Sequence, residues 1–216
     1  IGIYSDGDAK VKFGDNSKLT IGEGAVGLYS SDATKFNNTF EIETGKKLTV
    51  ELGKNSTFGL LNGNSGEVNV GTYLNNNPIN ISTFGSGASI FYTTGGVTAK
   101  LNENYTVTNG GAVSTSVLVG TNGSTVKNTK TLTTNTNIGL IATKGTGAST
   151  AQNNGTIVST RGSGIGIYTS ESTGNSTGTI TMQKVSSVGI LGKDNSTLTN
   201  SGKIEVLGAS SAGIYG

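Results

Sequence analysis

A four-residue phrase recurs along the whole chain of 216 residues and constrains the fold more than any other feature. The second positions of its copies, from Gly2 to Gly213, lie 22 to 32 residues apart with a mean near 26. A repeat of this length is typical of solenoids, in which each repeat forms one turn of a coil. The nine copies are IGIY at 1, VGLY at 26, FGLL at 58, ASIF at 88, SVLV at 116, IGLI at 138, IGIY at 165, VGIL at 188 and AGIY at 212.

A second phrase, G-x-I, accompanies the first in the later part of the chain. It begins at Gly155, Gly178 and Gly202, each 11 residues before the glycine of the next four-residue phrase. Constant spacing between two phrases indicates that these repeats share one local structure. Residues 71–115 fit the repeat poorly, so we expect a less regular coil there.

Short alternating runs predict the secondary structure within each repeat. Runs such as KLTV, EVNV, NPINIS and KIEV place an apolar residue at every second position, as half-buried strands require. Glycine, 35 residues in all, and asparagine lie between the runs, where turns belong. Helical stripes with a 3.6-residue period are scarce, and we expect almost no α-helix. The sequence predicts an all-β fold, a parallel β-solenoid of about nine turns of roughly 26 residues, stacked into a rod about 40 Å long.

The positions of the phrase predict different environments. A glycine at position two fits a bend, or a place where a neighbouring turn leaves no space for a Cβ atom. Position three, always Ile or Leu, predicts an interior ladder. Position four is ambiguous between an exposed aromatic stripe and an internal stack beyond a corner, and its aliphatic members favour the internal stack, so we do not predict a binding site there. In this alignment its members are Tyr4, Tyr29, Leu61, Phe91, Val119, Ile141, Tyr168, Leu191 and Tyr215.

Composition argues against several kinds of function. The chain has no His and no Cys, which removes Ser-His-Asp catalysis and the usual zinc sites. Its net charge of +2 is scattered and makes no nucleic-acid footprint, and no run of about 18 apolar residues could cross a membrane. GEGAVG at 22–27 matches a dinucleotide-binding pattern, but no helix is expected after it. We therefore expect no catalytic residue, no metal, no cofactor and no enzyme activity; Asp6, Asp8, Asp15 and Asp194 fit turns better than calcium sites.

The two phrases together resemble a known family. The pattern N-x-G-x-I, about ten residues and S-x-G-I-Y, as in NSGKIEVLGASSAGIYG at 200–216, resembles the passenger domains of large type V autotransporters, especially long fusobacterial outer-membrane adhesins. The resemblance implies a right-handed β-helix on the cell surface, anchored in the outer membrane by a C-terminal barrel and serving attachment to host cells or other bacteria. It also implies that residues 1–216 are one slice of a longer passenger, with the signal peptide and the barrel outside it.

Candidate binding residues come from the two longest turns, between residues 27 and 89, because binding determinants of solenoids tend to lie on loops that leave the coil. We expect a monomer that binds a host-surface protein or glycan or a partner bacterium, without nucleic acid and without membrane insertion. Two alternatives stay open: a structural or self-associating stalk, and a β-helical polysaccharide-active enzyme, which would need a carboxylate cluster. The candidates are Asp32 and Lys35 in SSDATKFNN, and Tyr73, Asn75, Asn76 and Asn77 in GTYLNNNP.

Overall fold

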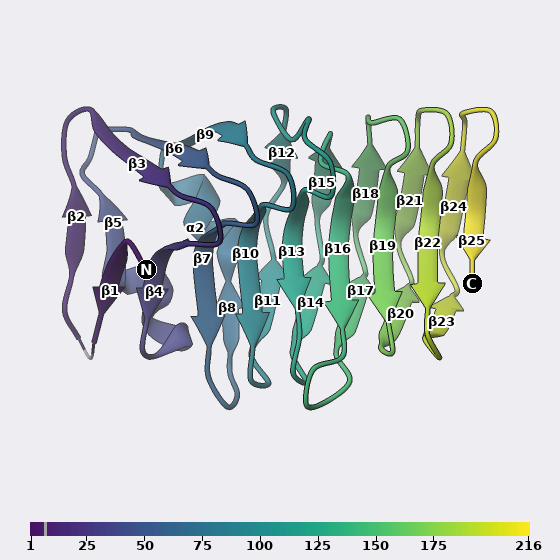
Figure 1. The fold of residues 1–216 in the computed structure, drawn as a ribbon, viewed down its shortest axis with the longest axis horizontal. Helices are drawn as coiled ribbons and strands as arrows, with labels where there is room; N and C mark the ends of the chain where they lie inside the picture. Colours follow the sequence, from purple (N-terminus) through teal and green to yellow (C-terminus); the bar gives the residue numbers. More distant parts are fainter. Residues whose placement is uncertain (7) are drawn as a thin grey trace.

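The chain folds as a parallel β-solenoid, as the sequence predicts. A computed structural model describes residues 1–6 and 8–216, and in it the chain winds along one long axis (Figure 1). The nine copies of the phrase form one continuous parallel sheet, which bounds eight complete turns rather than nine. Its strands in order are β1 (Ile3–Ser5), β4 (Val26–Ser30), β7 (Thr57–Asn62), β10 (Ser89–Thr94), β13 (Ser116–Gly120), β16 (Ile138–Thr143), β19 (Ile165–Ser170), β22 (Val188–Lys193) and β25 (Ala212–Tyr215).

The next strand of each turn belongs to one of two further parallel sheets. The first two turns contribute β2 (Val11–Phe13) and β5 (Phe40–Ile42), which pair only with each other. The later turns build a six-stranded sheet. It contains β8 (Glu67–Asn69), β11 (Thr98–Leu101), β14 (Thr125–Asn128), β17 (Thr150–Asn153), β20 (Thr173–Ser176) and β23 (Thr197–Asn200).

The last strand of each turn completes the coil and is also split between two sheets. The N-terminal sheet holds three strands, and the C-terminal sheet holds five. The three are β3 (Ser17–Ile21), β6 (Leu48–Leu52) and β9 (Ile79–Phe84), and the five are β12 (Tyr105–Val107), β15 (Thr131–Thr134), β18 (Thr156–Ser159), β21 (Thr179–Met182) and β24 (Lys203–Val206).

Three short helices lie where the sheets are interrupted. They are η1 (Ala33–Lys35), α1 (Phe36–Thr39) and α2 (Val70–Asn76), within the two turns predicted to leave the coil. The free edge of β9 is blunted, because a register shift interrupts its pairing with β6 and Pro78 directly precedes it. In the part of the chain that the structure describes, no helix is long and apolar enough to cross a membrane.

The interior changes character along the rod. In the C-terminal turns, ladders of buried Ile and Leu fill it, such as Ile167 and Ile190 at position three. The turns that carry the helices contain more residues and hold a cluster of aromatic rings. Within that cluster Phe36 packs on Tyr73 and Phe91 with ring centroids 5.3 and 5.5 Å apart, edge to face. The helices α1 and α2 thus each add a large side chain, Phe36 and Tyr73, to the core of these longer turns.

The strand register corrects the sequence alignment of two repeats. Leu28 pairs with Gly59, and Gly59 pairs with Phe91, so the third and fourth copies are shifted by one residue. Position two is then filled by Phe58 and Ile90 in these copies, and position four by Leu60 and Tyr92. In other copies the prediction that position two leaves no space for a Cβ atom is confirmed. A Cβ atom on Gly166 would lie 2.6 Å from the carbonyl oxygen of Gly189 in the next turn.

Position four faces outward, so the internal stack favoured from the sequence is wrong. Along each strand the residues at positions three and five are buried in most turns, while position four is half-buried or exposed. The neighbouring strands carry the same outward position in register, from the Tyr4–Tyr29 pair onward. The outer ridge, as we call this row, consists of Tyr4, Tyr29, Leu60, Tyr92, Val119, Ile141, Tyr168, Leu191 and Tyr215.

Candidate functional site

The two predicted excursions from the coil meet each other at the surface. Asn37, on α1, donates a hydrogen bond from Nδ2 to the carbonyl oxygen of Asn69 just before α2 (2.9 Å). Asn77, just after α2, accepts one at Oδ1 from the backbone N–H of Ile42 (3.0 Å) and donates one from Nδ2 to the carbonyl oxygen of Tyr73 (2.9 Å). These bonds fix α1, β5 and α2 together as one surface.

An open cleft of about 340 Å³ lies between these elements, and we call it the amide cleft. Four of its lining residues are asparagines: two lie on α1, one is the last residue of α2 and one directly follows α2. The amides of Asn38 and Asn76 point from exposed residues and have no hydrogen-bond partner among the described residues. The full lining is Asn37, Asn38, Glu41, Ile42, Thr72, Tyr73, Asn76 and Asn77.

The only charged residue that lines the amide cleft, among those described, is already paired. Lys10 Nζ lies 3.3 Å from one carboxylate oxygen of Glu41, and Lys12 Nζ lies 4.0 Å from the other. The chemistry left open in the cleft is therefore that of neutral amides and the Thr72 hydroxyl. The Thr72 hydroxyl also accepts a hydrogen bond from Asn102 Nδ2 at 2.6 Å.

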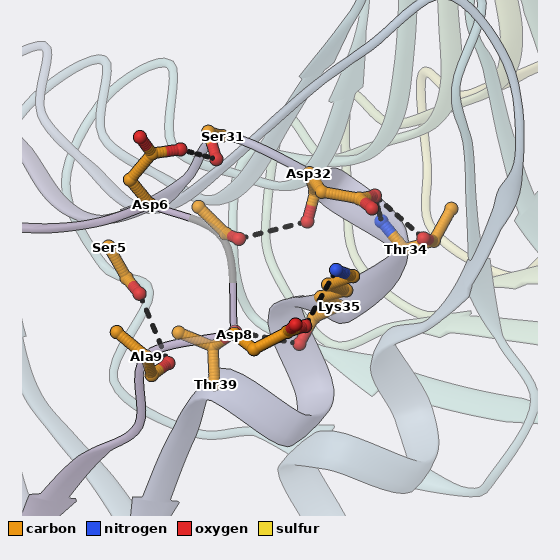
Figure 2. Close-up of polar contacts among 10 residues, drawn as sticks. Ser5, Asp6, Asp8, Ala9, Ser31, Asp32, Thr34, Lys35 and Thr39 are labelled. Atoms are coloured by element: carbon orange, nitrogen blue, oxygen red, sulfur yellow. Dashed lines mark hydrogen bonds and ion pairs between the residues drawn. The ribbon is translucent and has the colours of Figure 1, made fainter.

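A second hollow of about 240 Å³ adjoins the amide cleft and shares Asn38 with it. Lys35 crosses this hollow and donates a hydrogen bond from Nζ to Asp8 Oδ1 at 2.7 Å (Figure 2). That bond and the negative charge of Asp8 raise the pKa of Lys35 above its usual value. Lys35 is thus held against its partner in the preceding turn and stays protonated.

Asp32 serves the local fold of the first excursion. Its Oδ1 accepts hydrogen bonds from the hydroxyl (2.6 Å) and the backbone N–H (2.9 Å) of Thr34, which caps the start of η1 (Figure 2). These bonds, with a smaller contribution from the charge of Lys35, lower the pKa of Asp32. In the same view Ser31 donates from its hydroxyl to Asp6 Oδ1 at 2.6 Å.

The structure separates the four candidates of the second excursion. Tyr73 borders the amide cleft but is only 1% exposed, and its ring packs in the aromatic core, so its side chain serves the fold. Burial raises the pKa of its phenol. Asn76 and Asn77 line the amide cleft, whereas Asn75 is exposed and is not among its lining residues.

Five lining residues of the amide cleft were not among the candidate residues: Asn37, Asn38, Glu41, Ile42 and Thr72. Asn38 follows Asn37 in KFNN, and this second asparagine pair was a signal similar to the Asn75–Asn77 run. Glu41 gave no signal, because its place beside α2 depends on how two separate turns stack.

The outer ridge is a second candidate surface. It runs along all nine strands of the continuous sheet and combines five tyrosines with four aliphatic residues. The rings of Tyr4 and Tyr29 lie 5.4 Å apart between centroids and are tilted by 43°. Such a row presents a half-buried apolar strip to whatever lies next to the rod.

Comparison with known proteins finds no family model, no curated protein and no solved structure that matches the chain. Among residues 1–6 and 8–216, no three or more Asp and Glu side chains gather closely enough to hold a metal ion.

Proposed function

We propose that the chain is an attachment segment of a surface-exposed bacterial adhesin, a right-handed β-helical passenger of the type V autotransporter kind held at the outer membrane. In this proposal the regular turns are the rod, and the helical interruption carries the contacts with host cells or partner bacteria. The resemblance of the repeat phrases to such passengers supports the location, and the shape of the interruption supports the role.

One observation carries the proposal. The helical segments of both long turns line the amide cleft, and that of the first also lines the adjoining hollow, which shares Asn38. The regular C-terminal turns from β13 to β25 instead pair strand by strand in every sheet. The coil is irregular in one region, and an open polar cleft lies there. This arrangement suits a binding site carried on a regular, rod-shaped spacer.

The test is attachment of the purified 216-residue fragment. Labelled fragment is added to epithelial cells and to partner bacteria, and saturable binding is measured by flow cytometry. A variant with Asn38→Lys and Asn76→Lys is compared with a matched control, Asn75→Lys on the same helix. We expect binding by the wild type and the control and its loss in the double variant, whereas a folded wild type that binds no cell type would contradict the proposal.

The outer ridge favours a second candidate, self-association of rods side by side. Nine rungs spaced by about 4.8 Å form a strip about 38 Å long, too narrow to bury the roughly 1,200 Å² of a standard stable interface. The candidate is thus a weak contact that gains strength only along longer rods. Sedimentation velocity tests this candidate with the fragment at 10 µM to 1 mM, roughly the range in which weak complexes form. A sedimentation coefficient that rises with concentration, and no longer rises in the Tyr92→Ser and Tyr168→Ser variants, would support self-association. A constant monomer would exclude it.

A further inference from the structure

We infer that the amide cleft binds a neutral saccharide, so that the attachment of the proposed function is to the sugar of a surface glycan. The inference rests on that proposed function for its biological setting, but its chemistry comes from the cleft alone. A hollow lined by Asn80 and Asn109 also carries amides and no charged side chain, but its volume of about 110 Å³ is about a third of that of the amide cleft.

The size of the cleft suits a sugar. Its volume of about 340 Å³ lies at the lower end of the range found for small-molecule sites, which is about 300–1,000 Å³. The walls come from three elements that hydrogen bonds tie together, so the shape exists before a ligand arrives. A pre-formed site loses less free energy to ordering when it binds.

The free polar groups match hydroxyl groups. Each side-chain amide offers two N–H donors and a carbonyl acceptor, and a sugar hydroxyl likewise both donates and accepts. Asn38 and Asn76 stand on different helices and have both functions free, within the described part of the chain. A ligand that bridges them must therefore present several hydroxyls with different orientations, as a pyranose ring does.

The other lining residues of the amide cleft narrow the class of sugar that it can bind. Ile42 offers a partly buried apolar surface for the C–H face of a sugar ring. Glu41 lines the cleft, whereas its partners Lys10 and Lys12 are not among the lining residues, so a sialylated or sulfated sugar would meet a carboxylate there and is disfavoured. Neutral hexoses and N-acetylhexosamines are thus the expected ligands.

Another, larger cleft has different chemistry. It lies between the first two turns, measures about 410 Å³ and is lined by Lys18, Lys46 and Lys47 together with Asp15 and Glu51. Ion pairs of 2.6 Å between Lys46 and Asp15 and 2.9 Å between Lys18 and Glu51 occupy most of these charges. Among the described residues Lys47 is the lining lysine without an ion pair, so the group left open in this cleft is a cation.

The experiment uses the folded fragment and a printed array of neutral and sialylated oligosaccharides. The neutral oligosaccharide with the strongest signal is then titrated by calorimetry into three proteins: wild type, Asn38→Ala with Asn76→Ala, and Asn75→Ala. Because the substituted side chains are exposed and make no hydrogen bonds with the described residues, and alanine favours helices, all three proteins should fold alike. Circular dichroism verifies this.

We expect retention of neutral oligosaccharides, at least a tenfold loss of affinity in the double variant and no change in Asn75→Ala. An array on which the folded wild type retains no neutral oligosaccharide, or equal affinity in the double variant, would overturn the inference. The cell-binding assay separates this failure from that of the proposed function. If attachment depends on Asn38 and Asn76 but survives periodate oxidation of the cell-surface sugars, the proposed attachment function is retained and the saccharide is rejected as its ligand.

Discussion

Asn128 and Asn153 are both fully buried in consecutive turns, and Asn128 Nδ2 donates a hydrogen bond to Asn153 Oδ1 over 2.8 Å. The ladder continues to the next turn, where Asn153 Nδ2 donates to the hydroxyl of Ser176 at 3.2 Å. Each asparagine stands at the end of its strand, and Asn153 also donates to the carbonyl oxygen of Thr179 after the bend. Polar residues of this chain thus hold the corner of the coil, where backbone carbonyls would otherwise be buried without partners.

Replacing Asn153 by alanine should destabilise the rod. The substitution removes the hydrogen bonds of Asn153 with Asn128, Ser176 and Thr179 inside the core. Asn128 Nδ2 keeps the carbonyl oxygens of Lys130 and Thr156 as acceptors, and we expect the free energy of unfolding to fall by about 1–3 kcal/mol. Urea unfolding monitored by circular dichroism measures the change. Asn75→Ala, which removes an exposed asparagine, is the control and should leave the midpoint unchanged; equal midpoints for both variants would mean that the ladder adds nothing.

Gly166→Ala should be costly, because the turns stack too closely for a side chain there. The added Cβ atom would lie 2.6 Å from the Gly189 carbonyl oxygen and 2.9 Å from Ile180 Cγ2. Forcing it in should lower the free energy of unfolding by about 1–3 kcal/mol. Gly22→Ala has no atom within 4 Å of the new Cβ and should be tolerated. Thermal unfolding of the two variants measures the difference. If Gly166→Ala is tolerated, the close stacking of turns at Gly166 is contradicted.

The inward and outward directions of the phrase can be tested on neighbouring residues. Ile167 is fully buried at position three, so Ile167→Ala should cost about 2–5 kcal/mol of stability. Tyr168 belongs to the outer ridge, and Tyr168→Ala should cost less than about 1 kcal/mol. Chemical denaturation compares the two, and a larger loss for Tyr168→Ala would restore the internal stack.

The buried hydroxyl of Tyr73 makes no hydrogen bond among the described residues. Tyr73→Phe should therefore preserve or raise stability, by up to about 1 kcal/mol, since it removes an unsatisfied polar group. It should also change the alkaline limb of the stability profile. Burial raises the pKa of the phenol in the folded chain, so its contribution is complete below the unfolded pKa near 10 and is lost as pH rises above it.

Denaturant titrations between pH 8 and pH 11, which span the usual tyrosine pKa of about 10, measure this effect. The wild type should lose stability faster than Tyr73→Phe as pH rises through that range. Parallel slopes for the two proteins would show that Tyr73 ionises as easily in the folded state as in the unfolded chain.

The repeat made the fold predictable from the sequence, but it misplaced two of its copies by one residue. Glycine occupies position two in most copies, so the sequence alignment placed Gly59 of FGLL at position two. In the structure Gly59 stands at position three, where a Cβ atom would lie 2.5 Å from the ring of Phe91 and 2.9 Å from that of Phe36. The glycine is needed there to admit aromatic rings that come from other turns, and no local pattern reports such a contact.

The candidate site was predictable in place but not in detail. The long turns and their asparagines marked residues 27–89 as the irregular part of the rod. The sequence GTYLNNNP has no continuous apolar stripe, so neither the seven-residue helix α2 nor the burial of Tyr73 was expected. Both depend on packing against Phe36 and Phe91, and tertiary contacts of this kind override local propensity.

The most direct test of the account is photo-crosslinking from two single positions of the folded fragment. A photoactivatable residue is placed at position 76 in the amide cleft or at position 168 on the outer ridge, and the yield of covalent adducts with the epithelial cell surface is measured. The account predicts adducts from position 76 that excess unlabelled fragment suppresses, and only background from position 168. Adducts from position 168 alone, or background yield from both positions, would contradict it.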